Sequence, residues 1–146
     1  MASRIALVAE AVATAINAAT LPLAATAQVA WMPFTDRIDA GALACWVVPS
    51  TETPAHLGRR VAQYDCEILV ALQKAAEDEA EVGNLVAALE AINDALFQRA
   101  IPLPGDPTPG DAAFVSARLE PVLDPDHWNR LKQYTGVIRL IYRVFA

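Results

Sequence analysis

Few residues of this 146-residue chain have types and spacing that could do chemistry, and only one group of them is clustered. Asp124, Asp126 and His127 could supply acid–base groups or metal ligands. One histidine and two carboxylates without a further ligand fall short of a structural zinc site. Their spacing is that of a turn that starts a helix, with Asp124 as the N-cap and Pro125 in the first helical position. We therefore interpret the cluster as structural.

The two cysteines are the other candidates. A long loop separates Cys45 from Cys66, and neither has a partnered histidine, so we interpret them as small buried side chains rather than nucleophiles. If the two strands that carry them form a hairpin centred between Ala55 and His56, Cys45 lies directly opposite Cys66. Their Cβ atoms would then be about 4.5–5.5 Å apart.

Known catalytic motifs are missing from the sequence. It has no Gly-x-Ser-x-Gly elbow, no phosphate-binding glycine loop and no His-Glu-x-x-His helix. We therefore predict no catalytic residue, no metal site and no cofactor, and an enzyme is the poorer hypothesis. A net charge of −6 and a pI near 4.8 argue against non-specific binding of nucleic acid, which needs a basic surface.

A charge-free run at 11–35 is long enough to cross a membrane. It contains polar residues and two prolines, Pro22 and Pro33, which a membrane helix disfavours. We predict a soluble helix followed by a strand, and no membrane association.

Arginines are the more informative polar residues. Arg139 and Arg143 are four positions apart on a predicted strand, so they share one face with the apolar residues of odd number. Such a mixed face fits a subunit interface, and a half-exposed edge strand is an equal alternative. The predicted interface residues are Arg59, Arg60, Val137, Arg139, Ile141, Arg143 and Phe145.

The elements that must position these residues follow from periodicity. Apolar residues at spacings of three and four predict one helix after Ser3 and a second at 77–99. Alternation predicts strands at 26–32, 43–48, 62–73, 112–119 and 135–145, with loops at 49–61 and in the proline-rich segment 102–110. We predict a single α+β domain over residues 1–146, with two main helices packed on a largely antiparallel sheet of about four to five strands.

Charge is unevenly distributed over these elements. Residues 61–111 carry ten acids and two bases, whereas 112–146 carry five bases and three acids. The apolar stripe of the second helix must pack on the sheet, so Glu81, Glu90 and Asp94 are predicted to face away from it.

Two strand motifs carry a family resemblance. They are Tyr64-Asp65 through Gln73-Lys74 and Tyr134-Thr135 through Tyr142-Arg143-Val144, in the order helix, strands, helix, proline-rich loop and final strands. In these motifs and this order the chain resembles the small tail-terminator or tail-completion (neck) proteins of long-tailed bacteriophages.

The resemblance implies a virion structural protein, assembled in the host cytoplasm, that forms a homohexameric ring at the head-proximal end of the tail. The ring would cap the tail tube protein and present a surface to the head-completion or stopper protein, while DNA passes through its lumen without specific binding. A reducing cytoplasm implies free thiols. We expect the acidic helix outside the ring, and Arg59 and Arg60 against a neighbouring subunit or the tail tube.

Two other classes remain open at this point. A head–tail connector or stopper protein of the neck has similar size and also lacks enzyme motifs. A small monomeric ligand-binding domain or enzyme, with a pocket under the sheet, is the third possibility.

Overall fold

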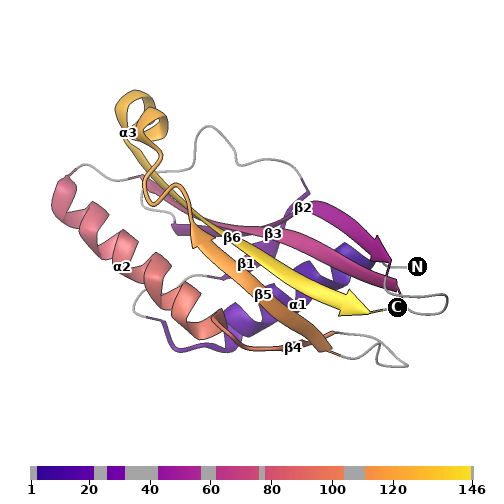
Figure 1. Ribbon diagram of the computed structural model, residues 1–146. Coiled ribbons are helices and arrows are strands. Elements are labelled where there is room, and N and C mark those ends of the chain that lie inside the picture. Colours follow the sequence, from indigo (N-terminus) through magenta and orange to yellow (C-terminus); the bar gives the residue numbers. More distant parts are fainter. Residues whose placement is uncertain are drawn as a thin grey trace.

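The computed structural model describes residues 3–21, 26–31, 43–56, 62–75, 78–103 and 111–145. Six strands form one sheet in the order β1-β2-β3-β6-β5-β4, with β1 parallel to β2 and the other neighbours antiparallel (Figure 1). The elements are α1 (Arg4–Ala18), β1 (Ala27–Val29), β2 (Leu43–His56), β3 (Ala62–Ala75), α2 (Glu79–Leu96), β4 (Ile101–Pro102), β5 (Asp111–Leu119), α3 (Pro125–Leu131) and β6 (Gln133–Phe145).

The predicted fold class, two main helices on a largely antiparallel sheet of four to five strands, is wrong. The sheet is mixed and has six strands, more residues lie in strands than in helices, and α3 is a third helix. The additional strand is β4, which falls partly in the segment predicted to be irregular. A strand of two residues carries no periodicity, and only its pairing with β5 creates it.

Strand β2 also continues far beyond its predicted end. It passes through Pro49 and Pro54, which were assigned to a loop, and pairs with β3 as far as His56. Beside β2, β1 pairs only with Cys45–Val47, so the rest of that edge has no second strand among the described residues. Proline is tolerated on such an edge because no ladder hydrogen bond is lost there.

Helices α1 and α2 pack on one face of the sheet (Figure 1). Ser3 caps α1 by accepting from the Ala6 N–H at 3.2 Å, and Asp78 caps α2 by accepting from the Glu81 N–H at 2.8 Å. Their apolar stripes bury the even-numbered residues of β3 and β6 in a common core. The largest fully buried apolar side chains of this core are Tyr134, Tyr142, Ile16, Ile68, Leu72, Leu85, Leu89, Ile92, Leu96, Ile138 and Leu140.

The predicted pairing of the two cysteines is wrong. Cys45 lies opposite Leu72, and Cys66 lies opposite Glu52. The partner of Cys45 is six positions later than predicted, because β2 continues past Pro49 and pairs with β3 over a longer stretch. Both thiols are free and buried, as the resemblance implied.

Tyr142 carries a defect in this core. Its hydroxyl is buried, has no hydrogen-bond partner among the described residues, and its pKa is raised to about 12 by desolvation. An unpaired buried hydroxyl costs about 1–3 kcal/mol. We therefore expect Tyr142→Phe to raise the free energy of unfolding in urea by about 1 kcal/mol. A loss of stability would show that the hydroxyl has a partner.

Candidate interaction surface

The sheet face away from α1 and α2, called the outer face from here on, carries the odd-numbered residues of β3 and β6. Two ion pairs cross between these strands. Arg143 Nε donates to Asp65 Oδ1 at 3.0 Å, and Arg139 Nη1 donates to Glu67 Oε1 at 3.3 Å. The two arginines therefore do share a face, but carboxylates on the neighbouring strand balance their charge.

Arg143 is the more firmly held of the two. Its Nη2 also donates to Asp65 Oδ2 at 3.4 Å, so the contact is bidentate. With the Gln63 amide oxygen turned toward the guanidinium, Gln63 accepts from Arg143 Nε at 2.6 Å. The hydrogen bond to Asp65 raises the pKa of Arg143 above its usual value. Asp65 and Glu67, two positions apart on an alternating strand, were the sequence signal for these partners.

The other predicted interface residues differ in exposure along β6. Phe145 is 50% exposed and Ile141 is half-buried, so both are open to a partner. Val137 is only 4% exposed, so its own chain already covers it and it is not open to a partner. Arg59 and Arg60 lie outside the described residues.

At the end of the outer face where β6 begins, α3 covers a buried polar network. Trp46 Nε1 donates to Gln73 Oε1 at 3.1 Å, and Gln73 Nε2 donates to Thr135 Oγ1 at 3.3 Å. Thr135 Oγ1 lies 2.7 Å from His127 Nδ1. Because the indole N–H can only donate, Gln73 Oε1 faces Trp46 and Gln73 Nε2 faces Thr135.

This network gives the Asp124 cluster its structural role, as predicted. Asp124 caps α3 by accepting from the Asp126 and His127 N–H groups at 3.0 and 3.3 Å. Pro125 occupies the first helical position, so the predicted start of the helix is confirmed. The network itself was missed, because Trp46, Gln73 and Thr135 are far apart in sequence.

Thr135→Val tests the network. The substitution keeps the shape of the side chain but leaves the Gln73 amide, which is 0% exposed, without its acceptor. We expect the free energy of unfolding in urea to fall by about 2 kcal/mol. Thr135→Ser keeps the hydroxyl as an acceptor for Gln73 and serves as the control, since it should retain most of the stability. Equal stability of the valine variant and wild type would contradict the network.

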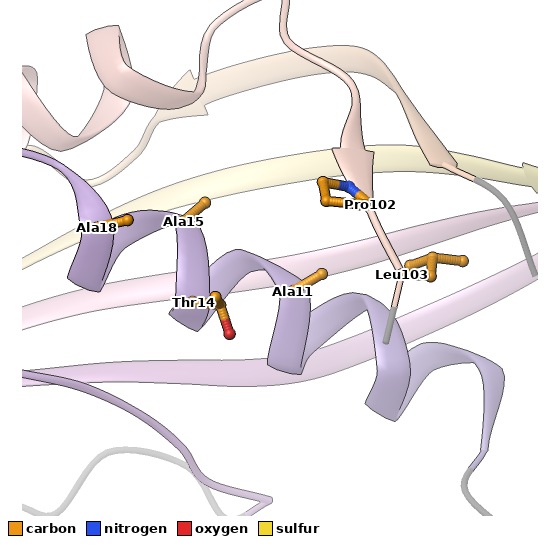
Figure 2. Close-up of a pocket in the computed structure, with 6 residues that line it drawn as sticks. All are labelled: Ala11, Thr14, Ala15, Ala18, Pro102 and Leu103. Atoms are coloured by element: carbon orange, nitrogen blue, oxygen red, sulfur yellow. The ribbon is translucent and has the colours of Figure 1, made fainter. Parts of the chain in front are cut away.

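Two of the hollows in the surface lie on opposite faces of the sheet. One, of about 370 Å³, lies on the outer face and is lined by Glu67, Ser116, Ala117, Arg118, Arg139 and Ile141. The other, of about 440 Å³, lies between α1 and the end of β4 (Figure 2). Figure 2 shows small side chains of α1 facing Pro102 and Leu103 across it. This second hollow is almost wholly apolar and contains no titratable group.

The buried thiols are poor nucleophiles. Desolvation raises the pKa of Cys45 to about 12, and desolvation with the charge of Glu52 raises that of Cys66 to about 11. Thiolate, the reactive form, is therefore scarce at neutral pH. Within the described residues, no group of three His, Cys, Asp or Glu side chains could hold a metal ion. No helix in this part of the chain is long and apolar enough to span a membrane.

Comparison with known proteins finds a similarity to a solved structure. No protein-family model and no curated protein matches this chain. Among solved structures, it is similar to a chain from the virion of a native gene transfer agent particle, with 16% sequence identity and a TM-score of 0.40. The alignment covers 92% of this chain and 82% of that one.

Proposed function

We propose that this chain is a virion structural protein, a tail terminator whose ring caps the tail tube and joins it to the head-completion proteins. The proposal rests on one observation. Helices α1 and α2 cover one face of the sheet, whereas the half of the outer face that lies away from α3 is exposed and has the composition of a protein interface. There, charge-balanced arginines surround half-buried Ile141 and exposed Phe145.

The chemistry of this open face fits a protein partner. Arginine and aromatic residues are enriched at protein–protein interfaces, and lysine is depleted. Because the Asp65 and Glu67 carboxylates hold Arg143 and Arg139 in place, these side chains lose less conformational freedom on binding than free arginines would.

A structural role without enzymatic activity is part of the proposal. The buried side chains that could act as nucleophiles, Cys45 and Cys66, are held protonated at neutral pH by their raised pKa values. In the Asp124 cluster, the other candidate, Asp124 accepts from two N–H groups at the start of α3 and His127 contacts Thr135.

The test is to delete the gene in cells that produce the particles and to examine the lysate by electron microscopy. A tail terminator predicts overlong tails without heads. Normal tails beside unattached heads would instead assign a connector or stopper role. Complete, infectious particles would contradict a virion role. Complementation with wild type is the control.

A further inference from the structure

Helix α2 presents an outer surface that its own chain does not explain. The helix holds four acidic residues and no Lys or Arg. Glu90 and Asp94 are exposed four positions apart, where like charges repel, and Asp94 lies in the last turn, where the helix dipole disfavours a carboxylate. Neither makes an ion pair within the described part of the chain.

Gly83 belongs to the same surface. It lies in the interior of α2, where glycine costs about 1 kcal/mol relative to alanine. A Cβ added there would meet nothing within 4 Å, so no contact in the described chain requires glycine. Ala87, one turn later, is exposed and small as well. The outer surface of α2 thus has two small residues, Gly83 and Ala87, at one end and two acidic residues, Glu90 and Asp94, at the other.

The outer face of the sheet brings two positive charges together. Arg118 on β5 is the direct cross-strand neighbour of Arg139 on β6, and like charges in such a pair are destabilising. Each has one surface carboxylate already: Arg118 Nε lies 2.7 Å from Glu120 Oε2, and Arg139 contacts Glu67. A guanidinium has five N–H donors, so Arg118 and Arg139 can each donate to another carboxylate. Both arginines line the hollow of about 370 Å³.

We propose that the acidic end of α2, Glu90 and Asp94, binds Arg118 and Arg139 on the outer face of a second copy of this chain. The two acids have no cation within the described part of the chain, and the two arginines keep N–H donors that their single carboxylates do not use. Where natural sequences break local rules, the compensation is expected in a functional contact. The inference rests on the proposed self-assembly and names the surfaces that would make it.

The contact is head-to-tail. The two surfaces are different parts of the molecule: α2 packs on one face of the sheet (Figure 1), and Arg118 and Arg139 belong to the opposite face. A symmetric pairing of either surface with itself would bring like charges together. Contacts between unlike surfaces repeat from copy to copy, and they close into a ring when the rotation allows it.

The experiment measures self-association of the full chain by sedimentation velocity. We expect wild type to associate reversibly, and less so as salt rises from about 0.05 to 0.5 M. The neutral variants E90Q/D94N and R118Q/R139Q should each weaken association about tenfold or more. An equimolar mixture of the two should form a 1:1 pair and nothing larger, because each retains one intact surface. The charge-swapped chain E90R/D94R/R118E/R139E should associate again.

The matched control is E10Q/D111N, which makes the same charge change as E90Q/D94N at two exposed acids elsewhere and should leave association unchanged. Unchanged circular dichroism of every variant shows that all fold. A wild type that stays monomeric at low salt, or association indifferent to both neutral variants, would overturn this contact. Gene deletion that still gives overlong, headless tails would meanwhile leave the proposed function standing.

Discussion

Replacing Gly136 with alanine is expected to cost about 3 kcal/mol or more of the free energy of unfolding. A Cβ at this position of β6 would lie 2.8 Å from Leu89 Cδ2 of α2 and 2.8 Å from the Val122 carbonyl oxygen, and it would overlap the Tyr134 hydroxyl. That hydroxyl donates to the same carbonyl at 2.8 Å, so the methyl group would break a buried hydrogen bond as well as overpack the core.

The measurement is urea unfolding followed by tryptophan fluorescence, with Gly83→Ala as the matched control. The same change at Gly83 meets nothing within 4 Å and lies in a helix, so it should raise the free energy of unfolding by about 0.5–1 kcal/mol. A Gly136→Ala variant as stable as wild type would mean that α2 does not pack on β6 as described.

Alkaline pH is expected to destabilise the protein through its two buried thiols. An unfolded cysteine ionises near pH 8.5, whereas burial raises the pKa to about 12 for Cys45 and about 11 for Cys66. Above pH 8.5 the folded chain therefore binds more protons than the unfolded chain, and stability falls as pH rises. Each thiol contributes a slope of about 1.4 kcal/mol per pH unit, so we expect a loss of about 3–4 kcal/mol between pH 8.5 and 10.

Urea unfolding at a series of pH values tests this expectation, and Cys45→Ala/Cys66→Ala is the control. The double variant should be less stable at every pH because it leaves cavities, but its stability should be nearly flat from pH 8.5 to 10. The same slope in the variant and in wild type would show that groups other than the thiols cause the loss. Above pH 10, Tyr142, with its pKa raised to about 12, adds to the decline in both proteins.

The helices were the most predictable part of the fold. In α1 and α2 the cap residue, the apolar stripe and the acidic first turn of α2 all lie within about 20 residues, so local sequence contains them. Glu90 and Asp94 are exposed and face away from the sheet, as the apolar stripe predicted. Glu81 does not: its Oε1 lies 2.5 Å from Lys74 Nζ of β3. The start of α3 was predictable for the same reason.

The edges of the sheet were not predictable. Strand β2 passes through two prolines that read as loop residues, and β4 is too short to show alternation. Whether a proline is tolerated depends on whether its missing N–H faces a neighbouring strand, which is a property of strand order. The misplaced hairpin, and with it the predicted opposition of Cys45 and Cys66, has this one cause.

By itself, the sequence determined what is local or periodic: the helices, the alternation of β3 and β6, and a common face for Arg139 and Arg143. Only the tertiary structure decided which partners that face acquires, because pairing distant strands fixes the register between them. That register sets Asp65 opposite Arg143 and Arg118 opposite Arg139. It turns an apparently cationic strand into a charge-balanced surface on which two arginines lie opposite each other on neighbouring strands.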